Sequence, residues 1–231
     1  MIISIHQPDY IPYPGLFYKM YQSEIFVFLD DAQFSNENMH HWNKIKTPQG
    51  ELRLKIPVEQ HLGDTINHVR TRDELKWKEK HLKTIKMNYS KAPYLNDFYP
   101  EFEEMLLSKY SSLAEQNITI NTRIAEHFGI KSRLYRTSDM VIDTLKEDRV
   151  IDICVAFGAD TYISGNGARA YQVDGHFTSR GVKLVYTDYH AIEYPQLWKE
   201  FIPNMSIIDY IFNCGFDFDR VLEDIKKKNL Q

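Results

Sequence analysis

A histidine stands directly after the first apolar segment of the chain, where it could move protons. Residues Ile2–Ile5 predict a short buried strand, which ends at His6-Gln7-Pro8 because proline lacks a hydrogen-bond donor and restricts the residue before it. Histidine has an ordinary pKa of about 6.5, and a strand end holds it rigidly, so it suits proton transfer at neutral pH. We predict that His6 is a general base and that Gln7 is a second catalytic residue. The alternative is a structural histidine that bonds to the backbone.

Acidic residues follow the second predicted strand. The segment Glu24–Leu29 is closed by Asp30-Asp31, and Gln33 comes shortly afterwards. These side chains could orient His6, hold a sugar hydroxyl or bind a divalent ion, whereas capping of a turn is the alternative. We predict a catalytic role for Asp30 and substrate binding by Asp31 and Gln33.

A glycine-rich turn connects a later strand to the next predicted helix. The strand expected at Thr161–Ser164 leads into Gly165-Asn166-Gly167. Glycine allows a positive φ and close approach of a ligand, and the N–H groups at the start of a helix attract anions. The turn is neither the G-x-G-x-x-G dinucleotide motif nor the lysine-containing P-loop. We predict a phosphate, pyrophosphate or carboxylate site at Ser164, Gly165, Asn166 and Gly167, with a simple tight turn as the alternative.

Five further residues are candidate substrate contacts. Tyr10 and Tyr171 could pack against a sugar or a base, although packing in the core is the commoner use of tyrosine. Asn43 and Lys44 lie on opposite faces of a predicted strand, where the lysine could meet a phosphate or face solvent. His190, after the last predicted strand, completes the candidate site.

Composition narrows the class of protein. The net charge of −4, without a basic tail, gives no electrostatic sign of nucleic-acid binding. No apolar run approaches the roughly 20 residues that a membrane span needs, and the N-terminus has no signal-peptide architecture, so we expect a cytoplasmic protein. The side chains of His40 and His41 diverge, and Cys154 and Cys214 are far apart in the chain. We therefore predict neither a metal site nor a disulfide framework.

The predicted elements alternate between strands and helices. Such alternation implies an α/β fold with a mainly parallel sheet flanked by helices, in which ligands bind outside the carboxyl ends of the strands. We expect one domain over residues 1–231, with a helical insertion or subdomain at about 70–128. A hairpin is predicted from Asn43–Thr47 and Leu52–Val58, and further strands from Ser132–Tyr135 and Val182–Tyr186. Helices are expected at Leu16–Gln22, Asp73–Tyr89, from Pro100 onward, from the capping box at Ser112 to Phe128, and at Leu145–Phe157, Ala168–Val173 and Ser206–Phe212.

Many of these segments together resemble the WbqC-like protein family. The resemblance covers nearly the whole chain and rests on Ser4–Pro12, Gly15–Lys19, Phe26–Phe34, Asn43–Thr47, Pro57-Val58, Trp77, Lys80-His81, Tyr89–Tyr94, Ser164-Gly165 and Phe201–Gly215. Two departures stand out. The family commonly has an Asn-Arg-Asn run where this chain has His41-Trp42-Asn43, so an arginine that could contact phosphate is absent. It also has a histidine–proline pair where this chain has His190-Ala191, which leaves the orientation of His190 open.

The resemblance implies a biological context more than a mechanism. Members of the family often accompany genes for O-antigen and other surface polysaccharides, and some are thought to attach acyl or aminoacyl groups to amino sugars. We expect a transferase that acts on a nucleotide-linked amino sugar and uses an acyl thioester of coenzyme A or of a carrier protein as co-substrate. The basic helix Lys76–Lys86 would suit an acidic carrier protein. The alternatives are nucleotidyl transfer or ATP-dependent ligation, and non-catalytic binding of a sugar nucleotide.

Overall fold

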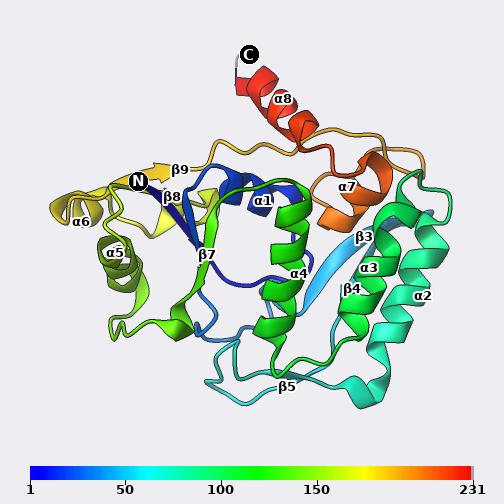
Figure 1. The fold of residues 1–231 in the computed structure, drawn as a ribbon, viewed down its shortest axis with the longest axis horizontal. Helices are drawn as coiled ribbons and strands as arrows, with labels where there is room; N and C mark the ends of the chain where they lie inside the picture. Colours follow the sequence, from blue (N-terminus) through cyan, green and yellow to red (C-terminus); the bar gives the residue numbers. More distant parts are fainter. Residues whose placement is uncertain (230–231) are drawn as a thin grey trace.

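The centre of the fold is a parallel β-sheet with helices on both of its faces (Figure 1). The computed structural model describes residues 1–229. Five strands run parallel in the order β7-β2-β1-β8-β9. They are β1 (Ile2–His6), β2 (Ile25–Phe28), β7 (Arg133–Arg136), β8 (Thr161–Ser164) and β9 (Lys183–Tyr186). The predicted α/β class and all five predicted strands of this sheet are confirmed.

The strand order reverses beside β1, which lies in the middle of the sheet. In the backbone register, His6 pairs with Phe28 of β2, and Ser4 pairs with Ile163 of β8. The chain passes from β1 to β2 and β7 on one side, and later returns to β8 and β9 on the other side. A crevice forms at such a reversal, outside the carboxyl ends of the strands. The end of β1, which carries His6, is therefore the natural place for a ligand.

Side chains of β2 alternate between two apolar cores. Ile25 and Val27 belong to the smaller core, whereas Phe26 and Phe28 belong to the larger one. This follows from the two-residue period of a strand, and a strand that is apolar throughout is buried on both faces. The smaller core is closed by the helices α5 (Lys146–Ala156) and α6 (Asp174–Ser179).

The larger core joins the sheet to the central helices. Phe26 shares one buried cluster with Phe98 and Ile120, so the segment predicted as an insertion or subdomain packs into the same core as β2. Figure 1 shows α4 between β7 and α3. The helices that contribute to this core are α1 (Pro14–Tyr21), α2 (Trp77–Tyr89), α3 (Leu95–Leu107), α4 (Leu113–His127), α7 (Ile207–Cys214) and α8 (Phe218–Asn229).

The predicted hairpin is confirmed, with a shift in its second strand. β3 (Trp42–Thr47) pairs with β4 (Gly50–Lys55), and Gly50 has φ 107° at the turn. Such a φ favours glycine because a side chain would be strained there. The predicted second strand ran on to Val58, but that residue pairs in a separate short ladder, β5 (Val58–Glu59) with β6 (Arg70–Thr71).

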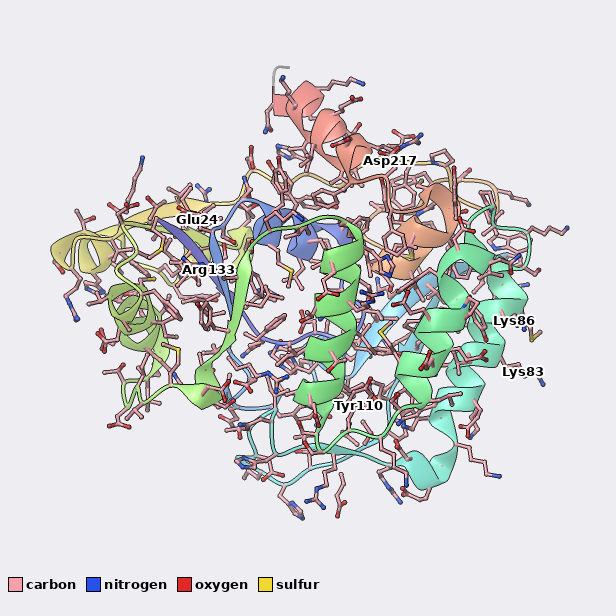
Figure 2. All side chains as sticks on the ribbon, in the orientation of Figure 1. Glu24, Lys83, Lys86, Tyr110, Arg133 and Asp217 are labelled. Carbon is pink, nitrogen blue, oxygen red and sulfur yellow. The ribbon has the colours of Figure 1, made fainter. Side chains whose placement is uncertain are left out.

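The helix predicted at Asp73–Tyr89 is broken near its start. A 3₁₀ turn, η1 (Asp73–Leu75), precedes α2, and Lys76 between them has φ 51°. Further along α2, Trp77 is buried, whereas Lys83 and Lys86 lie at the outer edge of the molecule (Figure 2). Lys80, Lys83 and Lys86 of this helix are thus exposed.

Three other helix predictions need correction. Pro100 does not begin a helix but lies inside α3, on an exposed side where water can reach the carbonyl that proline leaves unbonded. The helix expected at Ala168–Val173 is replaced by the 3₁₀ turn η3 (Asn166–Ala170) and by α6, which starts later. The C-terminal helix α8 was not predicted at all. Within residues 1–229, every helix is too short or too polar to cross a lipid bilayer.

Candidate functional site

A cavity of about 1090 Å³ opens at the carboxyl ends of β1, β8 and β9. His6 and Gln7 line it from the end of β1, and residues 164–167 line it from the turn after β8. Thr187 and Tyr189 contribute to its wall from the segment after β9. The cavity therefore brings together two features that the sequence singled out separately, the histidine and the glycine turn.

The carboxylate of Asp9 lies between two imidazoles. Its Oδ2 is 3.3 Å from Nε2 of His6, and its Oδ1 is 3.0 Å from Nδ1 of His40. Burial by itself raises the pKa of Asp9, but hydrogen bonds from His40 and His6 hold that pKa well below its ordinary value. Asp9 is thus an anion at neutral pH. It can orient the His6 ring and stabilise a positive charge that forms on it.

Lys19 of α1 approaches His6 from the other ring nitrogen. Its Nζ donates a hydrogen bond to the carbonyl oxygen of Ile5 at 2.9 Å and lies 3.2 Å from Nδ1 of His6. Only 4% of the lysine is exposed, and it lines the cavity. Desolvation lowers the pKa of Lys19 to about 7, against an upward effect of the Asp9 charge. A buried amine therefore completes the set of titratable groups around His6.

His6 is in a form that can accept a proton. Its side chain is 34% exposed because the ring borders the cavity. Desolvation lowers the pKa of His6, the charge of Lys19 lowers it further, and Asp9 acts in the opposite direction. The imidazole is consequently neutral at neutral pH, as a general base must be.

Two asparagines of α4 hold the loop that carries Asp9. The side-chain amide of Asn121 donates to the carbonyl oxygen of Asp9 at 2.9 Å. The amide of Asn117 donates to the carbonyl oxygens of Pro8 at 2.9 Å and of His40 at 2.7 Å. Both asparagines are fully buried. They hold the loop that carries Asp9 and the loop that carries His40 in fixed positions with respect to each other.

The structure gives Asn43 and Tyr10 packing roles in place of the predicted substrate contacts. Asn43 is 2% exposed, and its amide donates at 2.9 Å to the carbonyl oxygens of Tyr10 and Ile11. It therefore clamps the same loop from β3. The Tyr10 ring is fully buried, and its hydroxyl lies 3.1 Å from Nδ1 of His81. Neither side chain lines the cavity.

Asp30 and Asp31 tie β2 to the end of β7. Asp30 accepts hydrogen bonds from the backbone N–H of Ser138 at 2.9 Å and from its hydroxyl at 2.6 Å. Asp31 accepts from the hydroxyl of Thr137 at 2.6 Å and pairs with Arg149. The oxygens of both carboxylates are thus engaged within the protein, and neither residue lines the cavity. The turn-capping alternative describes Asp30 better than the predicted catalytic role.

Three other predicted contacts also lie outside the cavity lining. Gln33 is exposed and takes part in a short antiparallel bridge. Nζ of Lys44 is 2.6 Å from a carboxylate oxygen of Glu51, its neighbour across the hairpin. His190 is exposed, with Nε2 2.9 Å from Oδ1 of Asn229 in α8. The side chains of Lys44 and His190 thus have partners away from His6.

The glycine turn forms an open part of the cavity wall. Gly165 has φ −74°, so its backbone does not require glycine. A Cβ built on Gly165 or Gly167 would meet no heavy atom within 4 Å, so their missing side chains leave space for a ligand. The amide of Ala168 donates to the carbonyl of Gly165 at 3.0 Å, and the expected α-helical N-terminus does not form. Tyr171, 72% exposed, lines the cavity, and so do Ser164 and Asn166.

Tyrosine rings form the opposite part of the wall. The rings of Tyr13 and Tyr189 have centroids 5.5 Å apart in an edge-to-face arrangement, and both residues line the cavity. Gly15 lies directly behind them. A Cβ on Gly15 would lie 2.2 Å from an atom of the Tyr13 ring and 2.8 Å from one of Tyr189. Glycine is therefore required at this position for the two rings to pack where they do.

Charge around the cavity favours an anionic ligand. Lys19 and Lys146 both line it, and Glu147 is the acidic side chain in its wall. The carboxylate of Glu147 is occupied, because it accepts from the backbone N–H of Val173 at 2.8 Å and pairs with Nδ1 of His176. A phosphate or carboxylate would thus find two lysines without a competing free acid. Among residues 1–229, no three His, Cys, Asp or Glu side chains converge as metal ligands would.

Comparison with known proteins agrees with the motifs along the chain. The model of the WbqC-like protein family matches residues 7–220. The chain belongs to the WbqC-like family. This WbqC-like protein is also similar to an uncharacterized protein of Mycobacterium tuberculosis, Rv1507c, with 28% identity over 221 residues that cover 92% of this chain and 94% of that protein. No solved structure matches it.

Sequence reasoning missed three groups at the centre of this WbqC-like site. Lys19 carried a recognisable signal, because it is a single charge among the apolar residues of α1. Asp9 stands only three residues from His6, so their closeness in the sequence is the available signal. His40 comes 31 residues after Asp9, in a loop, and nothing local indicates that the two side chains meet.

Proposed function

We propose that this WbqC-like protein is a cytoplasmic transferase of surface-polysaccharide synthesis that acylates or aminoacylates the amine of a nucleotide-linked amino sugar. The donor is an acyl thioester of coenzyme A or of a carrier protein. The observation that carries the proposal is the His6–Asp9 pair at the edge of a large cavity that also holds the glycine turn. The titratable groups around this pair supply the base that takes the proton an amine must lose when it attacks a carbonyl carbon.

The shape and chemistry of the cavity support a substrate of this size. A volume of about 1090 Å³ is slightly above the range of roughly 300–1,000 Å³ usual for small-molecule sites, which suits a ligand as large as a nucleotide sugar. Tyrosines such as Tyr13 and Tyr171 offer flat surfaces for a sugar ring or a base. Lys146 and the space left by Gly165 and Gly167 favour phosphate groups.

ATP-dependent ligation is the second candidate, and one observation favours it. Lys19 and Lys146 both line the cavity, and a pair of cations suits a triphosphate as well as a diphosphate. The two reactions differ in their products. Ligation releases pyrophosphate from ATP, whereas acyl transfer releases a free thiol without ATP.

The test begins with a ligand screen on the full chain. Nucleotide sugars, coenzyme A esters and ATP are compared by thermal shift, because a ligand that binds the native state stabilises it by mass action. Combinations of the ligands that bind are then assayed for thiol release and for pyrophosphate release. Thiol release that depends on an amino-sugar nucleotide supports the proposal, and ATP-dependent pyrophosphate release would replace it with ligation.

Variants assign the activity to the site. His6→Ala is expected to lower turnover by about 100-fold or more with the fold intact. The control is His61→Ala, since the His61 side chain is 81% exposed and lies outside the cavity lining. Turnover within a few-fold of wild type in His6→Ala would refute the role of His6. Tight ligand binding without turnover in any combination would indicate a binding protein.

A further inference from the structure

Lys19 is a buried lysine without a carboxylate beside it. Among residues 1–229, no carboxylate oxygen lies within 4 Å of its Nζ, which bonds only to the Ile5 carbonyl oxygen and to His6. Lys78 is a useful contrast. It is also buried, but its Nζ is 2.8 Å from a carboxylate oxygen of Asp73. Buried charges are normally paired, so a lysine that lines the cavity without a carboxylate beside it calls for a functional explanation.

The surroundings of Lys19 favour its neutral form. The titratable groups that face it are His6 from β1 and Asp9 from the loop after that strand, and β2 contributes the Phe26 ring, 5.9 Å from Nζ. Asp9 stabilises the ammonium, but loss of water outweighs it and lowers the pKa of Lys19 to about 7. At neutral pH about half of the molecules therefore carry a free amine at this position.

His6 has a neighbour on each ring nitrogen. Nε2 faces the Asp9 carboxylate at 3.3 Å, and Nδ1 faces the Lys19 amine at 3.2 Å. Carboxylate, imidazole and amine thus form a row that ends at the cavity. In nucleophile–base pairs, a third group orients the base in the same manner. Because both ring nitrogens of His6 are engaged, the lone pair that remains for a substrate is the one on Nζ of Lys19.

We propose that Lys19 is a catalytic residue whose neutral amine takes the proton from the attacking amine of the substrate, with His6 and Asp9 as the relay behind it. This inference rests on the proposed acyl transfer. The substrate nitrogen forms a bond to the thioester carbonyl carbon, and the carbonyl electron pair moves onto oxygen. Nζ of Lys19 takes the proton from that nitrogen. When the carbon–sulfur bond breaks, the thiolate receives this proton, so the products are an amide, a free thiol and neutral Lys19.

The relay explains why three groups are needed. The ammonium that forms on Lys19 donates to Nδ1 of His6, and the anionic Asp9 on Nε2 strengthens that bond by polarising the ring. Lys19 itself is not proposed to carry the acyl group, because an acylated lysine is an amide and would end the reaction.

Competitive labelling tests the state of the amine without any substrate. The full chain is treated with a trace of isotopic acetic anhydride across a pH series, and each lysine is quantified by peptide mapping. Only a neutral amine reacts. Lys19 is expected to label with a midpoint near pH 7, and Lys44, whose side chain is 34% exposed and paired with Glu51, is quantified in the same peptide maps as the reference. A midpoint for Lys19 like that of Lys44, or no labelling of Lys19 up to pH 11, would overturn the proposal.

Two substitutions then separate proton transfer from simple attraction of an anion. Lys19→Arg keeps the positive charge and the donors but cannot lose a proton, and Lys19→Met removes both. Both variants are expected to lose about 100-fold or more of thioester-dependent transfer, with thermal unfolding as the check on folding. Activity retained in Lys19→Arg would show an anion-binding role and overturn the proposal.

The two measurements distinguish the inference from the function on which it rests. An active transferase whose Lys19 labels like Lys44 keeps the proposed function and rejects the role of Lys19. If Lys19 labels with a midpoint near pH 7 but the protein shows no thioester-dependent transfer, the proposed function is rejected. The proton transfer assigned to Lys19 is then rejected as well, and the labelling shows only that Lys19 has a reactive amine.

Discussion

Asn121 of α4 donates a hydrogen bond from its side-chain amide to the carbonyl oxygen of Asp9, at 2.9 Å and across 112 residues of sequence. We predict that Asn121→Ala lowers the free energy of unfolding by about 1–3 kcal/mol, because a buried carbonyl loses its donor. The pKa of His6 is expected to fall further, since a mobile Asp9 supports its charge less well. Urea unfolding measures the first effect, and NMR titration of the histidine ring measures the second.

The matched control is Asn88→Ala. The side-chain amide of Asn88 donates at 2.8 Å to the carbonyl oxygen of Thr84, and both residues lie in α2, one turn apart. That contact is local, so its loss is expected to cost less and to leave the titration of His6 unchanged. If both variants lose the same stability and the titration of His6 is unchanged in both, Asn121 does not position the Asp9 loop.

Gly167→Val is expected to weaken binding of the nucleotide sugar found in the ligand screen by about 10-fold or more. A valine side chain at position 167 would not clash with the protein, but it would occupy part of the cavity that the ligand needs. Calorimetric titration gives the dissociation constant. Gly175→Val is the control, because a Cβ there also meets nothing within 4 Å and the residue does not line the cavity. If both variants bind as wild type does, the glycine turn is not a ligand contact.

His41 is expected to make the protein sensitive to mild acid. The ring is fully buried, and neither of its nitrogens has a hydrogen-bond partner among residues 1–229. Desolvation lowers the pKa of His41 to about 4. Because the unfolded pKa is about 6.5, the unfolded chain takes up a proton first as the pH falls. The stability from the neutral ring is therefore complete above about pH 6.5 and is lost progressively down to about pH 4, by up to about 3 kcal/mol.

Urea unfolding at a series of pH values measures this loss. His41→Phe keeps an aromatic ring against Phe34, whose centroid is 5.2 Å from that of His41, and removes the titration. We expect a smaller fall in stability between pH 6.5 and 4 in this variant than in wild type. Parallel curves for the two proteins would show that His41 does not titrate as its burial implies.

Local patterns were sufficient for the sheet. The segments Ile2–Ile5 and Glu24–Leu29 are short and apolar at most positions, as strands with both faces covered are, and both form strands as predicted. His6 could be placed at the rim of a cavity because a proline follows it and because parallel strands end at one edge. The same logic correctly brought the glycine turn to the cavity that His6 lines.

Polar residues at strand ends were harder to assign. Asp30 and His6 each follow an apolar strand, yet only His6 lines the cavity. Asp30 instead satisfies the backbone and hydroxyl of Ser138, 108 residues later. A side chain at a strand end can face a cavity or contact a distant loop. Which of the two occurs depends on the path of the distant loop, and the residues next to the side chain in the sequence do not encode that path.

The sequence by itself determined the five strands of the parallel sheet and the edge at which His6 lies, because hydrophobic period and turn chemistry are local properties of the chain. Only the tertiary structure decided which groups surround His6. Asp9, His40 and Lys19 come from a loop, a second loop and a helix, and they meet because Asn117 and Asn121 fix one loop against the other and α1 packs beneath β1. The withdrawal of Lys19 from water, which makes its amine available, exists only once that packing is complete.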